Sequence, residues 1–181
     1  MPRYCAFLRA INVGRRRVKM DRLRRLFQEM GCTGVETLLA SGNVVFSAPN
    51  PQGLEERIEE ALHGALGYEV TTFVRTLAEV AQIARYPPFP PSQLKTPDSR
   101  LYIGFLTAAP EEQARQALLA CSTETDQFHI HERQVYWLCH TRMSESVFSG
   151  AQLERTLGMP TTMRNAKTIR RIAKKYPPQT P

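Results

Sequence analysis

Asparagine, serine and glycine residues gather in two short stretches of the first half, and these residue types suit the binding of an anion. Asn12 and Gly14 belong to the first stretch, and Ser41-Gly42-Asn43 forms the second. Side-chain amides and hydroxyls donate hydrogen bonds to anionic oxygens, while glycine lets the backbone approach a ligand closely. The same residues are equally typical of turns, in which glycine supplies a positive φ and asparagine a local cap. Both interpretations stay open at this point.

Positive charge is concentrated in two windows of the chain, although the net charge is only +7. Eight basic residues and one acid lie between Arg9 and Arg25, and six basic residues and no acid lie between Arg164 and Lys175. The two windows therefore carry +7 and +6, and the rest of the chain sums to −6. Such clustering favours an anionic partner such as nucleic acid, although a solvated helix face has a similar composition.

Ten residues are candidates for ligand binding, because each has a suitable side chain or backbone in or beside these stretches. They are Arg9, Asn12, Gly14, Arg15, Lys19, Ser41, Gly42, Asn43, Arg164 and Asn165. No catalytic residue is assigned, since the chain has no nucleophile elbow, phosphate-binding loop or dinucleotide-binding glycine pattern. The sequence therefore predicts no cofactor, and it leaves open whether the protein is an enzyme.

The histidines do not predict a metal site. His129 and His131 share one face of a predicted strand, but a two-residue turn at 132–133 would place His129 opposite Tyr136. His140 would then lie about four residues, or ~13 Å, further along the sheet, which is too far for joint ligation at bond lengths of about 2 Å. The four cysteines are widely spaced, as expected of buried thiols in a reducing compartment.

The composition and the start of the chain favour a soluble, cytoplasmic protein. Hydrophobic residues make up 42% and charged residues 23%, which is ordinary globular composition. Nothing resembles a signal peptide, and no apolar run approaches the ~20 residues needed to cross a bilayer. We expect no membrane partner, and the sequence does not predict an oligomeric state.

The order of predicted elements indicates an α+β fold with two tandem ferredoxin-like halves. In the first half, 1–85, strands are predicted at 4–11, 35–40, 44–47 and 68–75, and helices at 20–30, 54–65 and 76–85. In the second half, 100–176, strands are predicted at 101–107, 128–131, 135–140 and 160–163, and helices at 110–120, 144–157 and 165–176. Each half follows the βαββαβ order, and the second ends in a C-terminal helix.

Two further segments lie outside these halves. The segment 86–99 holds five of the thirteen prolines and is predicted to be a stiff connector. The tail, 177–181, is predicted to be frayed.

The predicted topology brings the two polar stretches together. The first two strands of a βαββαβ unit run parallel, so the end of the first strand and the turn after the second lie at the same end of the sheet. The N-terminus of the first helix, with its unpaired N–H groups and positive dipole, points to that end. We therefore expect Asn12 and Gly14 to lie beside Asn43, with Arg15 and Lys19 nearby, as an anion site.

RNA-recognition modules share this order of elements, but they stack bases on aromatic side chains of the two central strands. Here those strands offer only Phe7 and Phe46, and we expect both to belong to the hydrophobic core. Sequence-specific RNA recognition is therefore disfavoured, whereas binding to a nucleic-acid backbone stays open.

Three motifs resemble a known bacterial family. The segments LRAINVG (8–14), VKM (18–20) and SGNVVF (41–46) are similar to the LRGINVG, VPM and SGNVVF motifs of DUF1697, a family of unknown function. The resemblance extends over essentially the whole chain. It supports the fold, and it implies no reaction, because the family has no established activity.

The chain departs from the family pattern at several positions. Ala10 and Arg15 stand where the family usually has glycine, and the late motif T-x-RNWNT reads TMRNAKT (162–168), with Lys167 in place of asparagine. The family's usual Ser-Lys-Leu reads Ser-Val-Phe at 146–148. The N-terminal motifs are therefore the better preserved.

Two functions stay open. The first is binding of a phosphate-bearing partner, such as nucleic acid, through a basic edge of the N-terminal half together with the basic C-terminal helix. The second is an enzyme or a small-ligand-binding protein with a polar cleft between the halves. The residues expected to line that cleft are Arg9, Asn12, Ser41, Asn43, Arg164 and Asn165.

Overall fold

Two compact units make up the chain in the computed structural model, which describes residues 1–39, 42–95, 98–141 and 143–178. The first unit comprises Met1–Gln82 together with Ile172–Pro181, and the second comprises Ile83–Arg171. The boundaries between the units fall inside two helices, α3 (Leu77–Arg85) and α7 (Ala166–Lys175). The first unit is therefore discontinuous in sequence.

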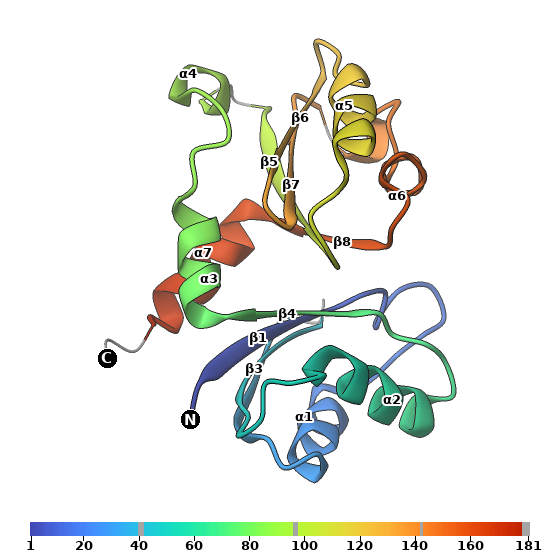
Figure 1. Cartoon of the computed structure of the whole chain (residues 1–181), viewed down its shortest axis with the longest axis vertical. Coiled ribbons are helices and arrows are strands. Elements are labelled where there is room, and N and C mark those ends of the chain that lie inside the picture. Colours follow the sequence, from blue (N-terminus) through green and yellow to red (C-terminus); the bar gives the residue numbers. More distant parts are fainter. Residues whose placement is uncertain (40–41, 96–97, 142, 179–181) are drawn as a thin grey trace. The chain divides into compact units, whose positions relative to one another are not determined.

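The first unit has the predicted ferredoxin-like topology. Its elements are β1 (Arg3–Leu8), α1 (Met20–Glu29), β2 (Thr33–Leu38), β3 (Asn43–Ser47), α2 (Leu54–Leu66), β4 (Thr72–Thr76) and the start of α3. The strands form an antiparallel sheet in the order β2-β3-β1-β4. Helices α1 and α2 cover one face of this sheet (Figure 1). The order of elements is as the sequence predicts, with boundaries that differ by a few residues.

The core of the first unit forms where the apolar face of α1 meets the sheet. Leu23 and Phe27 are four residues apart, so they lie on the same face of the helix, and both are fully buried. The ring of Phe27 packs edge-on against that of Phe46, with 5.1 Å between centroids. Phe7 and Phe46 are both fully buried, so the prediction that they belong to the core is confirmed.

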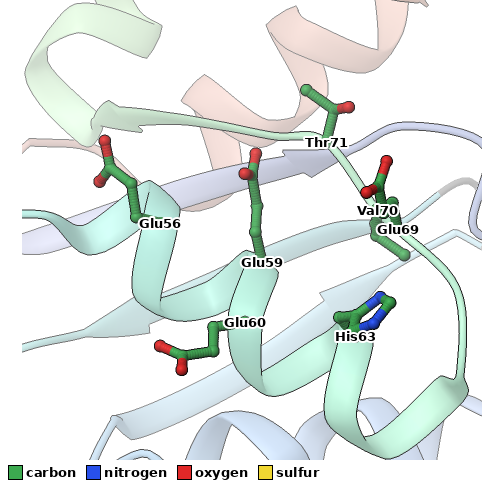
Figure 2. Close-up of a pocket in the computed structure, with 7 residues that line it drawn as sticks. All are labelled: Glu56, Glu59, Glu60, His63, Glu69, Val70 and Thr71. Carbon is green, nitrogen blue, oxygen red and sulfur yellow. The ribbon is translucent and has the colours of Figure 1, made fainter.

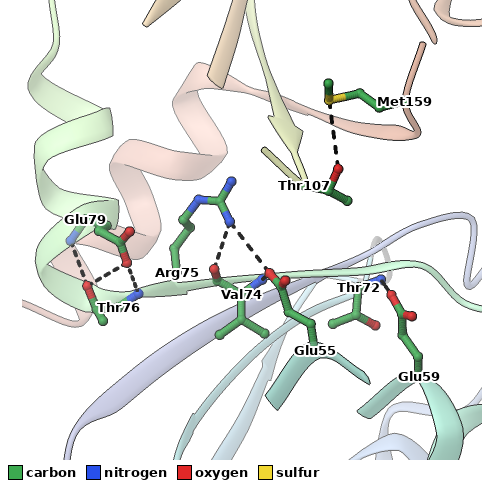
Figure 3. Close-up of polar contacts among 9 residues, drawn as sticks. All are labelled: Glu55, Glu59, Thr72, Val74, Arg75, Thr76, Glu79, Thr107 and Met159. Carbon is green, nitrogen blue, oxygen red and sulfur yellow. Dashed lines mark hydrogen bonds and ion pairs between the residues drawn. The ribbon is translucent and has the colours of Figure 1, made fainter. Parts of the chain in front are cut away.

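Strand β4 lies at the edge of its sheet, and side chains of α2 satisfy two of its outward N–H groups (Figure 3). The Thr72 N–H donates to Glu59 Oε1 at 2.7 Å, and the Val74 N–H donates to Glu55 Oε1 at 2.6 Å. Four helical residues rise about 6 Å and two strand residues about 6.7 Å, so the two spacings match. Glu55 and Glu59 therefore belong to the link between α2 and the sheet and not to a solvated helix face.

The second unit repeats this topology. Its elements are α4 (Pro91–Leu94), β5 (Arg100–Leu106), α5 (Glu112–Ala120), β6 (Asp126–His131), β7 (Gln134–Cys139), the 3₁₀ turn η1 (Met143–Glu145), α6 (Gly150–Leu157), β8 (Thr161–Asn165) and α7. The strands form an antiparallel sheet in the order β6-β7-β5-β8. The turn between β6 and β7 occupies residues 132–133, and His129 pairs with Tyr136, as the sequence predicts.

The predicted helix over 144–157 is wrong in its first part. The Ser146 hydroxyl accepts a hydrogen bond from the Phe148 N–H at 2.9 Å, which holds the segment before α6 out of a helical path. The helix begins only after Ser149, whose hydroxyl accepts from the Gln152 N–H while the Gln152 side chain accepts from the Ser149 N–H. This reciprocal capping box sets the start of α6.

The two units share the same strand-to-helix junction, although different residues cap the helix in each. β4 runs directly into α3, and β8 runs directly into α7. Thr76 caps α3 by accepting from the Glu79 N–H, and Asn165 caps α7 by accepting from the Lys167 N–H. The Thr161 N–H at the start of β8 donates to Glu154 of α6 at 2.9 Å, as Thr72 does to Glu59.

Each junction also carries one buried arginine on its strand. Arg75 of β4 is 1% exposed and Arg164 of β8 is 7% exposed. Each donates from Nη1 to the carbonyl of the residue before it, which is Val74 in the first unit and Met163 in the second. The structural similarity of the two units therefore includes this buried arginine and its hydrogen bond to the preceding carbonyl.

A buried carboxylate organises the core of the second unit. Asp126 is fully buried, and its Oδ1 accepts hydrogen bonds from Trp137 Nε1 and from Ser146 Oγ, both at 2.8 Å. Its Oδ2 accepts from Thr125 Oγ1 at 2.9 Å. The carboxylate thus ties β6 to β7 and to the segment that precedes α6, where Phe148 packs on the Trp137 ring.

None of the helices in the described ranges combines the length and apolar character that a membrane span requires.

We expect the substitution Asp126→Ala to lower the free energy of unfolding by roughly 3 kcal/mol, because it leaves the Trp137 indole N–H and the Ser146 hydroxyl without an acceptor. Guanidinium denaturation followed by the fluorescence of Trp137, the only tryptophan of the chain, measures the loss. The exposed carboxylate of Glu124 provides the matched control, and Glu124→Ala should change stability by less than about 0.5 kcal/mol. Equal losses of stability in both variants would contradict the conclusion that Asp126 organises this core as a hydrogen-bond acceptor.

Candidate functional site

The loop that follows β1 and the turn between β2 and β3 are neighbours in the first unit. The Leu8 N–H donates to the Gly42 carbonyl at 2.8 Å. A Cβ on Gly42 would lie 2.5 Å from Ile11 Cγ2 and 3.1 Å from Leu8 Cβ, so only glycine fits this contact. Gly42 also has a φ of +76°, which glycine adopts without strain. The turn therefore packs tightly against the loop.

The two asparagines of this region hold the backbone in place. Asn12 Oδ1 accepts from the Val18 N–H at 2.7 Å, and Asn12 Nδ2 donates to the Val18 carbonyl at 3.4 Å, so one side chain clamps both ends of the loop. Asn43 is fully buried, and its Nδ2 donates to the Leu38 carbonyl at 2.9 Å. Their amides thus form hydrogen bonds with the backbone of the loop and of the β2–β3 hairpin. Ser41, the third polar residue expected here, lies outside the described residues.

Several arginines of the same loop and of α1 are engaged by nearby groups. The Arg16 guanidinium lies over the Tyr68 ring, 4.2 Å from its centroid, and Arg17 Nη1 donates to the Gly14 carbonyl at 3.1 Å. Arg22 Nη2 donates to a carbonyl of α2, and Arg24 forms an ion pair with Asp21. These contacts fix the loop on the surface of the unit.

Three other cations of this region are exposed, and their side chains form no hydrogen bond or ion pair within the described residues. They are Arg15, Lys19 and Arg25. Lys19 is also the N-cap of α1, and no side chain caps that helix end. Gly14 is exposed beside them. We call Arg15, Lys19 and Arg25 the N-terminal basic surface.

The remaining candidates have different surroundings. Arg9 is half-buried, and its N–H donates to the Thr71 carbonyl. Arg164 is buried, and its Nη1 donates to Thr162 Oγ1 at 2.8 Å. Asn165 is half-buried at the start of α7. Arg164 thus belongs to the interior, whereas Asn165 stands at the beginning of the basic C-terminal helix.

Helix α7 is divided into an apolar and a basic face. Ile169 and Ile172 are fully buried. The other face is exposed and consists of Lys167, Arg170, Arg171, Lys174 and Lys175. We call these five residues the α7 basic face. Only Lys175 among them has an acidic partner in the described structure, and its Nζ lies 3.2 Å from Glu36 Oε2.

A pocket of about 420 Å³ in the first unit is acidic. Its lining residues are Glu56, Glu59, Glu60, His63, Glu69, Val70 and Thr71. Figure 2 shows the Glu59 carboxylate rising from α2 toward the segment Glu69–Thr71, whereas Glu60 points away from that segment. Among the described residues, no three His, Cys, Asp or Glu side chains form a group that could hold a metal ion.

Burial raises the pKa of the Glu59 carboxyl, and the neighbouring Glu55, Glu56 and Glu69 carboxylates raise it further, against the opposing effect of the Thr72 N–H. The run of glutamates is visible in the sequence, but the pocket is not. The residues 69–71 that complete it lie beyond the end of α2, and nothing in their types marks them as its wall.

The histidines of the second unit take part in an aromatic cluster. Tyr86 Oη lies 2.8 Å from His129 Nε2, and the Tyr86 ring stacks on His131 with 4.0 Å between centroids. Burial lowers the pKa of His129, and the nearby charges of Arg115 and His131 lower it further. His140 is held elsewhere, with its Nδ1 2.7 Å from Ser99 Oγ.

Comparison with known proteins agrees with the fold and supplies no activity. The model of the family DUF1697, described as a protein of unknown function, matches residues 1–136. A solved structure, that of the conserved bacterial protein SP0830 from Streptococcus pneumoniae, is similar, with a TM-score of 0.74 and 22% sequence identity. The similarity covers 97% of this chain and 98% of that chain, and at this identity it shows the fold alone. No curated protein matches the chain.

Gly42→Ala should lower the free energy of unfolding by roughly 3 kcal/mol, because the new Cβ would clash with Ile11 and an alanine would have to adopt the left-handed φ of Gly42. Gly14 is the matched control, since its φ is +62° but nothing lies within 4 Å of its Cβ position. Gly14→Ala should cost only about 1 kcal/mol. Thermal or urea denaturation measures both, and similar losses would show that the contact with Ile11 contributes nothing.

Glu59→Gln should stabilise the protein at pH 7 by about 0.5 kcal/mol, because it keeps an acceptor for the Thr72 N–H and removes repulsion among the carboxylates. A folded-state pKa that is raised means that the ionised carboxylate lowers stability at neutral pH. This cost disappears once the pH falls below about 4, so the two proteins should become equally stable there. Urea denaturation from pH 7 to pH 3.5 tests this, with the exposed Glu60→Gln as the control that shows little change.

Proposed function

We propose that this chain, which belongs to the DUF1697 family, binds the phosphate backbone of a nucleic acid without reading its sequence. The observation that carries the proposal is the α7 basic face. Five cations occupy positions i, i+3, i+4, i+7 and i+8 of one helix, and the helix contains no acidic residue.

The dimensions of this face suit a polyanion. Eight residues of α-helix rise about 12 Å, and a duplex carries about seven phosphate charges over that length. The charges of the α7 basic face therefore have a density comparable to that of the backbone they would meet. Arginine and lysine on such a face neutralise phosphates and release condensed counterions, which makes the binding favourable at low salt.

An ordinary solvated helix is organised differently. Exposed helices usually combine acids and bases four residues apart, because such pairs stabilise the helix, whereas like charges at this spacing destabilise it by a few tenths of a kcal/mol each. In α7 the pairs Lys167–Arg171, Arg170–Lys174 and Arg171–Lys175 are all of like charge. A bound anionic partner would offset this repulsion, so the arrangement favours binding of an anion over a role as an ordinary solvated helix face.

The N-terminal basic surface adds a second group of cations, at the uncapped start of α1, where the helix dipole also favours an anion. Recognition of bases is not part of the proposal, because Phe7 and Phe46 are buried and offer no platform for stacking. The contacts therefore concern phosphates.

Fluorescence anisotropy with labelled single-stranded and duplex oligonucleotides, measured between 25 and 200 mM salt, provides the test. The logarithm of the association constant should fall steeply with the logarithm of salt concentration, with a slope of about −0.9 per phosphate contact on duplex DNA. The double variant Arg171→Gln/Lys174→Gln should reduce the magnitude of this slope by about 2.

The matched control removes two exposed cations that lie outside both basic surfaces. Lys95→Gln/Arg155→Gln changes the net charge by the same amount, and it should leave the slope close to that of the unmodified protein. Absence of binding at 25 mM salt, or an equal effect of both double variants, would reject the proposal.

A further inference from the structure

A second pocket, of about 100 Å³, lies in the second unit at the start of α7. Three cationic side chains line it, Arg100 from β5 and Lys167 and Arg170 from α7. Among the described residues that line it, none carries a carboxylate. The lining is therefore basic, in contrast with that of the acidic pocket of the first unit.

The size of this pocket limits what it can hold. Sites that enclose a whole small molecule usually measure about 300 Å³ or more. The pocket is therefore smaller than a site that would enclose a complete nucleotide, and its size suits one small chemical group.

The position of two of the cations is unfavourable unless an anion is present. Lys167 is the second residue of α7 and Arg170 is the fifth, at the end of the helix where the dipole is positive. The first turn contains no acidic residue to offset them. An anion in the pocket would be attracted by both side chains and by the helix end. The three cations, and not the helix end alone, define the site.

The walls of the pocket are held in fixed positions. Leu138 and Ala166 are buried and contribute an apolar part of the lining. At the rim, Ser99 Oγ lies 2.7 Å from His140 Nδ1, and Arg100 Nη1 donates to the Ser99 carbonyl at 3.2 Å. A site whose rim is already ordered loses little entropy when a ligand binds.

We infer that this pocket binds a phosphomonoester, the terminal phosphate of a nucleic-acid strand. A phosphomonoester carries a charge of about −1.5 to −2 at pH 7, and it matches three cations better than the single charge of an internal phosphodiester. Arginine donates paired hydrogen bonds to phosphate oxygens, and lysine adds a point charge. The inference that the phosphate belongs to a nucleic-acid strand rests on the proposed function. The inference that the pocket binds a phosphate group does not depend on it.

The late motif TMRNAKT contributes directly to this pocket. Asn165, Ala166 and Lys167 all line it. Lys167 stands where the family usually has asparagine, so the departure from the family pattern adds a cation to the site. Arg164, taken from the sequence as a candidate ligand, lies in the interior instead, and Arg100 and Arg170 are the arginines that reach the pocket.

Titration with inorganic phosphate tests the pocket itself. The backbone amide signals of residues 165–170 are followed by NMR, with sodium chloride adjusted so that the ionic strength stays constant. We expect a saturable shift in the millimolar range, and at least about tenfold weaker binding in Lys167→Gln/Arg170→Gln. The control Lys95→Gln/Arg155→Gln removes two exposed cations that lie outside the pocket and outside both basic surfaces, and it should keep the affinity. No saturable shift, or equal weakening in both variants, would overturn the inference.

A second experiment compares one single-stranded oligonucleotide with a terminal phosphate at the 5′ end, at the 3′ end, or at neither. We expect about tenfold tighter binding of one phosphorylated form, lost in Lys167→Gln/Arg170→Gln and kept in the control. If inorganic phosphate binds and no oligonucleotide does, the pocket stands and the proposed function fails. If all three oligonucleotides bind equally and inorganic phosphate does not bind, the proposed function stands and the pocket inference fails.

Discussion

The fold depends on the satisfaction of backbone N–H groups at the edge of each sheet by carboxylates of the neighbouring helix. Glu55 and Glu59 serve β4, and Glu154 serves β8. An exposed edge strand invites pairing with other chains, and an unpaired N–H without water is costly. Carboxylates serve this edge in both units, and each of these edge strands runs directly into a helix. The second of these helices carries the α7 basic face.

The sequence predicts the fold well because the signals involved are local. Apolar residues at helical spacing mark α1, a glycine with a left-handed conformation ends α2, and the two-residue turn at 132–133 fixes the register that pairs His129 with Tyr136. The start of α6 is missed although the capping box of Ser149 and Gln152 that sets it is local, because a further interaction that holds the preceding segment is not local. Ser146 also bonds to the buried Asp126, which is twenty residues away and is not marked by any short motif.

The sites are harder to predict because a residue type does not reveal what its side chain contacts. Asn12 and Asn43 have the chemistry of ligand-binding residues, but the backbone uses their amides. Glu59 resembles a solvated residue, yet it caps a strand and lines a pocket. The basic windows are visible in the sequence, whereas only the fold separates the arginines held by other groups from those that remain exposed.

The discontinuity of the first unit affects the order in which the protein can be completed during synthesis. Glu36 of β2 accepts a hydrogen bond from the Tyr176 hydroxyl at 2.6 Å, and it lies close to Lys175 and Arg3. The ribosome makes Tyr176 only after the whole second unit, so this cluster cannot form while the chain is still short. The first unit is therefore completed only after the second, and a nascent chain must carry it without its last helical turn until Tyr176 has been made.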